Sequence, residues 1–183
     1  MKNTTLLPAL LGLALCASGA AMAAPTAEAK AAYTQAKDRA EADYKAAKIR
    51  CDAITGNPRD VCKAEANASR VRMREEASAL YQNTLKSYTQ SRLKIADAYY
   101  ARDKAKCDAL TGNDKDVCIK QAKSTLIASQ ADARADKKAI EARSDARDDK
   151  RTAEYKVAIE KCDAFAGAAK DSCVATAKSQ YGK

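Results

Sequence analysis

The sequence predicts an all-α protein built from elongated antiparallel helical hairpins. We expect a coiled-coil-like rod that tapers from four helices to two and is clipped by three disulfides. Three observations support this fold. A cysteine pair occurs three times at one spacing, glycine and proline after residue 25 are almost confined to the loops within these pairs, and the segments between the loops are rich in Ala, Lys, Arg and Glu.

The cysteine pairs belong to a repeated segment. The three copies read CDAITGNPRDVC from Cys51, CDALTGNDKDVC from Cys107 and CDAFAGAAKDSC from Cys162. The first two copies share nine of twelve positions, and the copies recur at steps of 56 and 55 residues. A regular step of this size indicates a repeated supersecondary unit.

The N-terminus has the pattern of a secretory signal peptide at residues 1–23. Lys2 precedes an apolar run, and Ala21-Met22-Ala23 has the small-x-small form of a cleavage site. Leu15 precedes Cys16 where a lipoprotein signal normally has a small residue, which argues against a lipid anchor. No later segment reaches the roughly 20 apolar residues of a membrane span, so we expect an exported, periplasmic chain without one.

Residues 24–183 form one predicted helical repeat domain with hairpin turns near 56–57, 112–113 and 167–168. More than fifty residues pass without Gly or Pro between Arg59 and Thr111, and again between Asn113 and Ala166. We therefore expect a continuous helix in each long segment. The predicted helices are 26–55, 58–111, 114–166 and 169–181.

Each turn has a local rationale. Gly56 suits the left-handed position after a helix, Asn57 suits the next N-cap, and Pro58 suits the first helical position. Gly112 and Asn113 repeat this arrangement. The third turn keeps Gly167 but replaces the N-cap Asn with Ala168, which predicts a looser helix start.

The cysteines flank each turn at similar heights on two antiparallel helices, so pairing within each copy is the favoured connectivity. The predicted disulfides are Cys51–Cys62, Cys107–Cys118 and Cys162–Cys173. Metal binding is the competing interpretation, but structural zinc sites usually combine closely spaced cysteines or include histidine. The sequence has neither feature.

Two long helices of about 80 Å would place the first and third turns at the same end of the rod. Met73, Leu80, Tyr88 and Ile95 would then belong to one coiled-coil-like seam. The alternative is a break near Gln82 and Asn83, or near residues 144–145, that folds the chain into a compact bundle. The polar run 142–151 is expected either to form a solvated helix or to fray.

A tyrosine precedes each repeat by seven residues, which places it on the helical face of the first cysteine. We expect these tyrosines to pack behind the disulfides, and the alternative is an aromatic ligand platform. The residues are Tyr44, Tyr100 and Tyr155.

The residues indicate no catalytic site, cofactor site or metal site. The chain has no histidine, which excludes Ser-His, Cys-His and histidine–metal arrangements. It also lacks a glycine-rich phosphate loop and a Cys-x-x-Cys redox motif. A non-enzymatic role without cofactors is therefore expected.

The net charge of +9 favours attraction to envelope polyanions, although 24 acidic residues are interspersed among the 33 basic ones. Nucleic acid is not an expected partner in an exported compartment. The sequence does not identify a partner protein, and it leaves self-association open.

The segment CDALTGNDKDVCIKQAKS, with KCDAFAGAAKDSCVATAKS near the C-terminus, resembles uncharacterised exported proteins of Gram-negative bacteria that are often labelled TolA-like or cell-envelope biogenesis proteins. The resemblance implies a cell-envelope role. It covers nearly all of residues 24–183.

The leading hypothesis is a non-enzymatic periplasmic scaffold, spacer or interaction module. The alternatives are a holdase chaperone for exported proteins, a basic rod that binds envelope polyanions, and a redox sensor with a reversibly reduced disulfide.

Overall fold

The structure, a computed structural model, describes residues 26–183 as five helices without a strand. They are α1 (Ala27–Asp52), α2 (Gly56–Gln82), α3 (Leu85–Cys107), α4 (Gly112–Cys162) and α5 (Gly167–Tyr181). The predicted all-α fold of antiparallel hairpins with three disulfides is confirmed. The predicted signal peptide and Cys16 lie outside the described residues.

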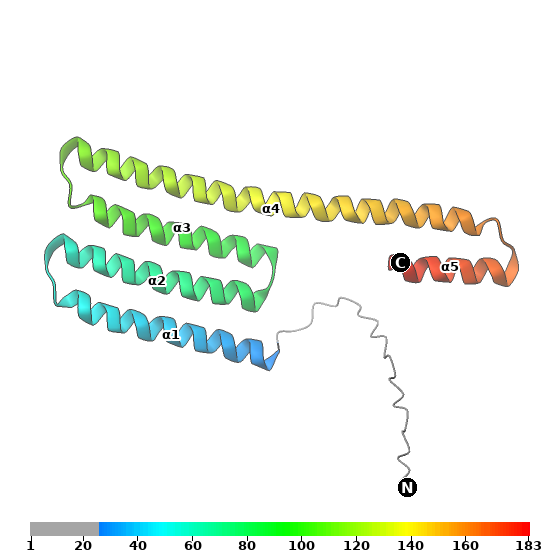
Figure 1. Cartoon of the computed structure of the whole chain (residues 1–183), viewed down its shortest axis with the longest axis horizontal. Helices are drawn as coiled ribbons and strands as arrows, with labels where there is room; N and C mark the ends of the chain where they lie inside the picture. Colours follow the sequence, from blue (N-terminus) through cyan, green and yellow to red (C-terminus); the bar gives the residue numbers. More distant parts are fainter. Residues whose placement is uncertain (1–25) are drawn as a thin grey trace, which may run out of the picture.

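The helices form a single layer. Among the described residues, α1 packs on α2, α2 on α3, α3 on α4, and α4 on α5, and no other helix pair is in contact. Four helices therefore lie side by side at one end, while only α4 and α5 lie at the other end (Figure 1). None of these helices is both long and apolar enough to cross a membrane.

The prediction of one continuous helix over 58–111 is wrong, because the chain reverses between α2 and α3. Asn83 adopts the left-handed conformation with φ of 46°, and its backbone N–H donates to the carbonyl of Ala79 at 2.8 Å. Thr84 then begins α3 in a capping box with Ser87: the Thr84 hydroxyl accepts from the Ser87 N–H, and the Ser87 hydroxyl accepts from the Thr84 N–H. The alternative break near Gln82 and Asn83 is thus the correct one.

This reversal changes the path of the rod. The first and second turns lie at the same end of the layer and the third lies at the opposite end (Figure 1), whereas the sequence predicted that the first and third would meet. The predicted seam from Met73 to Ile95 is also wrong, because its residues fall on two antiparallel helices. Leu80 is 68% exposed.

Helix α4 runs without interruption through residues 144–145, where a break was the alternative. Its 51 residues give a length of about 77 Å. The α2–α3 reversal at 82–84 corresponds, one repeat later, to Lys138, Ala139 and Ile140, which offer neither a left-handed asparagine nor an N-cap hydroxyl. The helix therefore continues, and α5 is carried away from the other helices.

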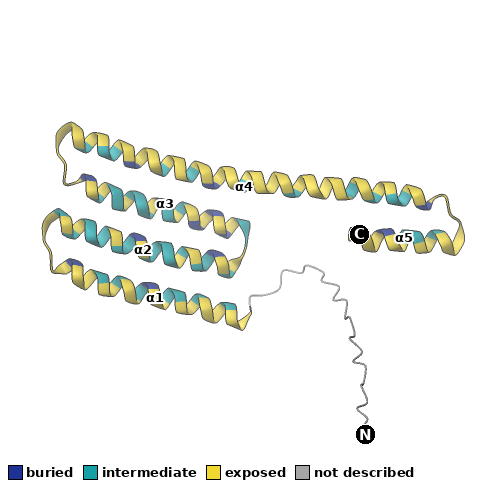
Figure 2. Ribbon diagram, viewed as in Figure 1, coloured by how far each residue is buried: buried dark blue, intermediate teal, exposed yellow. Residues whose placement is uncertain are grey.

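The polar run 142–151 forms a solvated helix. On one side of this run, Asp136 of α4 pairs with Arg92 of α3. On the other side, the Thr152 hydroxyl lies 3.4 Å from the ammonium of Lys183, which follows α5. Between these points most residues of α4 are exposed (Figure 2). The polar composition matches this position, because no neighbouring helix covers this stretch.

The core consists almost entirely of alanine and cysteine. Its buried apolar residues are Ala40, Cys51, Ala68, Ala79, Ala96, Cys107, Ala122, Ala133, Cys162 and Ala177. Except for Cys162, those in α1 to α4 form pairs eleven residues apart, an interval that spans about three helical turns and returns to the same edge. Each inner helix thus presents small side chains to its neighbours and leaves its two other faces to solvent.

We predict that Asn83→Ala lowers the free energy of unfolding by about 1 kcal/mol, because alanine is strained in the left-handed conformation. Asn83→Gly is the matched control and should be at least as stable as the native chain. Urea denaturation followed by circular dichroism measures both variants. An Asn83→Ala variant as stable as Asn83→Gly would contradict the reversal at this residue.

Candidate functional site

Each hairpin tip is closed by a disulfide of the same geometry. The bonds join Cys51 to Cys62, Cys107 to Cys118 and Cys162 to Cys173, with Cα–Cα distances of 5.6 Å in all three. The first cysteine of each pair is at most 1% exposed, and the second is partly exposed. These pairings agree with the sequence prediction. Because disulfide sulfurs are not thiolates, they join helices here and do not act as metal ligands or nucleophiles.

An ion pair crosses each turn beside the disulfide. The aspartate that follows the first cysteine accepts a bond from a lysine of the next helix: Asp52 from Lys63 at 2.6 Å, Asp108 from Lys115 at 2.8 Å, and Asp163 from Lys170 at 2.9 Å. These pairs were not predicted from the sequence. The signal was present, because the Cys-Asp-Ala triplet occurs in all three copies.

The ion pairs shift the pKa values of their members. The hydrogen bond from Lys63 lowers the pKa of the Asp52 carboxyl, and the hydrogen bond and charge of Lys115 do the same for Asp108. In the third turn, the hydrogen bond to Asp163 raises the pKa of the Lys170 ammonium. All of these groups lie at the surface, where water screens the interaction.

The turn residues differ partly from their predicted roles. The turn glycines Gly56, Gly112 and Gly167 have positive φ values of 55–69°. However, the helices begin at these glycines, and their N-cap residues are Thr55, Thr111 and Ala166, so the N-cap role predicted for the asparagines is wrong.

Asn57 instead connects two hairpins. Its side-chain amide donates to the carbonyl of Ala105 near the C-terminus of α3, at 2.9 Å. The bond lies close to the first two turns, so it joins their tips. At the start of α2, α4 and α5 the N-cap side chain forms no capping hydrogen bond. The start of α5, which was predicted to be looser, therefore does not differ from the other two in its capping.

The three predicted packing tyrosines are half-buried, and each contacts the other helix of its hairpin. The Arg70 guanidinium lies 4.2 Å from the centre of the Tyr44 ring, and the Lys123 ammonium lies 5.9 Å from that of Tyr100. Tyr155 packs edge-on against Tyr181, with ring centres 6.1 Å apart. The rings thus cover the seam of each hairpin behind its disulfide.

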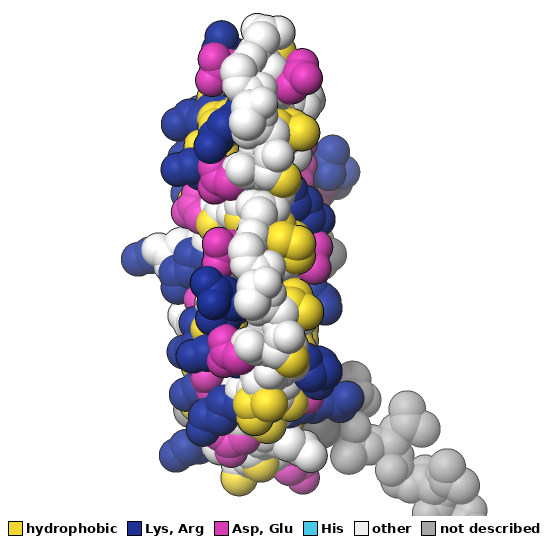
Figure 3. Space-filling view, turned by 90° about the vertical axis from the view of Figure 1, so that its left-hand side faces the viewer, with side chains coloured by type: hydrophobic (Ala, Val, Ile, Leu, Met, Phe, Trp, Pro, Cys, Tyr) yellow, Lys and Arg dark blue, Asp and Glu magenta, His cyan; other side chains and the backbone are white. Residues whose placement is uncertain are grey.

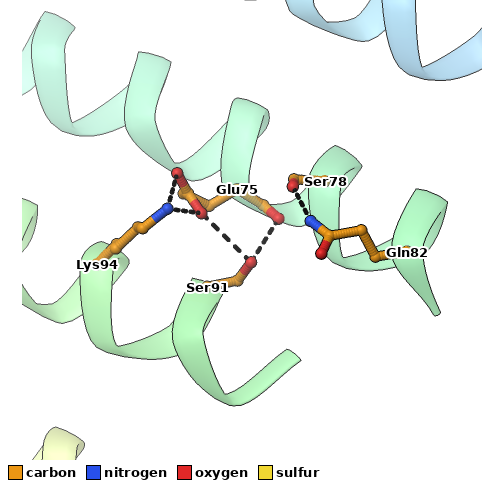
Figure 4. A network of polar contacts seen from close by, with 5 residues as sticks. All are labelled: Glu75, Ser78, Gln82, Ser91 and Lys94. Atoms are coloured by element: carbon orange, nitrogen blue, oxygen red, sulfur yellow. Dashed lines mark hydrogen bonds and ion pairs between the residues drawn. The ribbon is translucent and has the colours of Figure 1, made fainter. Parts of the chain in front are cut away.

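A polar network joins the first hairpin to the second across the α2–α3 seam (Figure 4). The Ser91 hydroxyl donates to the carbonyl of Glu75 at 2.7 Å, and the Lys94 ammonium donates to both carboxylate oxygens of Glu75 at 3.1 Å. This network was not predicted from the sequence, because all three residues fall within the continuous helix expected over 58–111.

At the end of the layer that carries the first two turns, charged side chains of both signs flank a central strip of hydrophobic side chains and uncharged atoms (Figure 3). A shallow groove beside the second disulfide is lined by Asp103, Lys106, Val117 and Gln121, among others. Among residues 26–183 no group of three or more Cys, Asp or Glu side chains is arranged to hold a metal ion. The distinctive features of this region are therefore the hairpin clamps and the open helical surfaces.

Comparisons of the chain with protein-family models, with curated proteins and with solved structures find no match.

We predict that replacing Cys107 and Cys118 together by serine lowers the free energy of unfolding by about 3 kcal/mol. Without the disulfide, the unfolded chain is no longer held in a closed loop and has a higher conformational entropy. Thermal unfolding followed by circular dichroism measures the loss. The Cys107→Ser/Cys118→Ser variant should retain the other two disulfides. Equal stability of the variant and native chain would show that the clamp does not stabilise the hairpin.

The ion pairs predict a pH dependence of opposite sign for the two kinds of group. The lowered pKa values of Asp52 and Asp108 mean that their pairs stabilise the folded chain above the ordinary Asp value of 3.8, and that this contribution disappears as the pH falls through the folded pKa. The Lys170 contribution is complete below 10.5 and disappears as the pH rises through its raised pKa.

NMR titration of the carboxyl carbons tests the acidic groups. Asp52 and Asp108 should titrate below 3.8, and Lys63→Ala should raise the pKa of Asp52 without changing that of Asp108. In the Lys115→Ala variant only Asp108 should change. A titration midpoint of Asp52 that is insensitive to Lys63→Ala would refute the pairing.

Proposed function

We propose that the protein is a non-enzymatic scaffold of the bacterial cell envelope that holds two helical units at a fixed separation. The observation that carries this proposal is the single continuous helix between the units. The first unit contains α1, α2, α3 and the first half of α4, and the second contains the last part of α4 with α5. The solvated stretch 142–151 of α4 joins them (Figure 1).

The disulfides support a location outside the cytoplasm, because such bonds persist in oxidising compartments. The periplasm is the proposed compartment, in agreement with the expected signal peptide and with the resemblance to TolA-like envelope proteins. The clamps would keep each unit closed while α4 sets the distance between them.

A helix break in the solvated stretch tests this function. Asp149→Pro removes a backbone donor inside α4 and should kink the helix, whereas Asp149→Ala keeps it intact. Photo-crosslinkers placed at the exposed positions Lys45 on α1 and Ser179 on α5 would identify the proteins captured at each unit in cells.

A scaffold should capture the same partner at each site in all variants. The complex that contains both partners should be lost from Asp149→Pro and retained in Asp149→Ala. Persistence of that complex after the helix is kinked, or the absence of any defined partner at both sites, would contradict the scaffold function.

A second candidate is a holdase chaperone, which is favoured by large apolar side chains that are exposed to solvent. Ile49 is 74% exposed and Leu80 is 68% exposed. A holdase should suppress aggregation of a reduced client protein at near-stoichiometric ratios. Its activity should fall in the Ile49→Ser/Leu80→Ser variant and should be insensitive to Asp149→Pro.

A further inference from the structure

The outer edge of α4 is open along its whole length. Helices α3 and α5 both pack on the same side of α4 (Figure 1). The opposite edge carries alanines at helical spacing, all of them exposed. They are Ala128, Ala131, Ala135, Ala142 and Ala146.

The repeat places this edge in register with an interface that the chain already forms. In the α2–α3 seam, the Ser87 hydroxyl lies 3.5 Å from the Ala79 carbonyl, and Ser91 binds the backbone of Glu75. From Cys62 to Cys118 the step is 56 residues, so Ala79 and Glu75 of α2 correspond to Ala135 and Ala131. From Cys107 to Cys162 the step is 55 residues, so Ser87 and Ser91 of α3 correspond to Ala142 and Ala146.

The first half of α4 therefore corresponds to the α2 side of the α2–α3 seam, and the second half corresponds to the α3 side. In the α2–α3 pair the chain reverses at Asn83, and the two sides meet within one molecule. In α4 the helix is continuous, so its two halves cannot meet each other. A second molecule can supply the missing side to each half.

The charges on the two flanks of this edge change sign near the middle of α4. On one flank Arg134 and Lys138 are followed by Glu141 and Asp145. Each pair is a like-charged i, i+4 pair, which destabilises an isolated helix. Lys137, next to the reversal of charge, is the midpoint of Gly112–Cys162.

The second flank has the opposite order, with Asp132 before the midpoint and Arg143 and Arg147 after it. Within residues 26–183 none of these three side chains forms an ion pair, nor do Arg134, Lys138 and Asp145. An antiparallel copy of the same helix would bring opposite charges together on both flanks.

We propose that α4 pairs antiparallel with α4 of a second copy of this chain, about a two-fold axis near Lys138 and Ala139. Ala135 then lies opposite Ala142 of the partner subunit, and Ala131 lies opposite Ala146 of the partner subunit. Arg134 faces Asp145 of the partner subunit on one flank, and Asp132 faces Arg143 of the partner subunit on the other. The contact is isologous, so each pair occurs twice.

The dimer continues the layer that each chain begins. At each end, α1, α2, α3 and the first half of α4 would be followed by the second half of the partner's α4 and then the partner's α5. Small residues allow the two α4 helices to approach closely, as they do at the Ala and Cys seams within the chain. This inference depends on the geometry and charges of α4 and is independent of the proposed scaffold function.

Charge inversion tests the interface. Sedimentation analysis of the purified, oxidised chain should show a dimer, and Arg134→Glu/Lys138→Glu should raise its dissociation constant at least about tenfold. Adding Glu141→Lys and Asp145→Lys to this variant restores opposite charges across the seam and should restore the dimer. Lys30→Glu/Lys45→Glu on α1 is the matched control, since it changes the net charge equally at exposed positions away from α4.

A zero-length carboxyl–amine crosslinker tests the register. In a mixture of isotopically light and heavy chains, mixed peptides should join Lys138 of one copy to Glu141 of the partner subunit. A monomeric native chain, a dimer insensitive to the double charge inversion, or a fourfold variant that stays as weak as the double variant would overturn the proposal. Circular dichroism and the three disulfides verify that each variant is folded.

Discussion

The disulfide at each hairpin tip is the constraint on which the rest of the structure depends. A Cα–Cα distance of 5.6 Å brings the backbones of two antiparallel helices close together. Only small side chains fit between helices at such a separation, which accounts for a core of alanine and cysteine. Because such a core has no large side chains to bury beneath a second layer, the helices extend as a row with two open faces.

Because small residues fill the seams between helices, most of the polar interactions between helices lie at the edges of these seams. Aspartate–lysine pairs cross the turns, and the Glu75 network joins neighbouring hairpins. Tyrosines with cationic or aromatic partners lie along the hairpins behind the disulfides. The protein thus combines a thin apolar seam with polar contacts on both sides of it.

Three residues determine whether the chain reverses direction between two hairpins or continues as one helix. Gln82, Asn83 and Thr84 end one helix and begin the next, whereas Lys138, Ala139 and Ile140 at the equivalent place sustain α4. The first two hairpins therefore lie side by side, and the third projects along the axis of α4. The long helix and its open edge, which carry both proposals, result from this local difference.

The sequence by itself determined the all-α fold, the three cysteine pairings and the approximate positions of the turns, because glycine placement and cysteine spacing act over a few residues. The half-buried tyrosines were also predictable, since a seven-residue spacing returns to one helical face. The break at Asn83, in contrast, competed with a strongly helical composition on either side. Its Thr84–Ser87 capping box was too short a signal to outweigh more than fifty residues without Gly or Pro.

Tertiary structure alone decided which turns share an end, which polar side chains meet across the α2–α3 seam, and which edge of α4 stays open. Asn57 shows the same division: its residue type suggested an N-cap, but the position of α3 made it a donor to Ala105. The physical reason is that a helix in this layer has two edges that can contact neighbouring helices and two faces that lie open to solvent. Local sequence establishes that the helix forms, whereas the path of the whole chain determines which sides are covered.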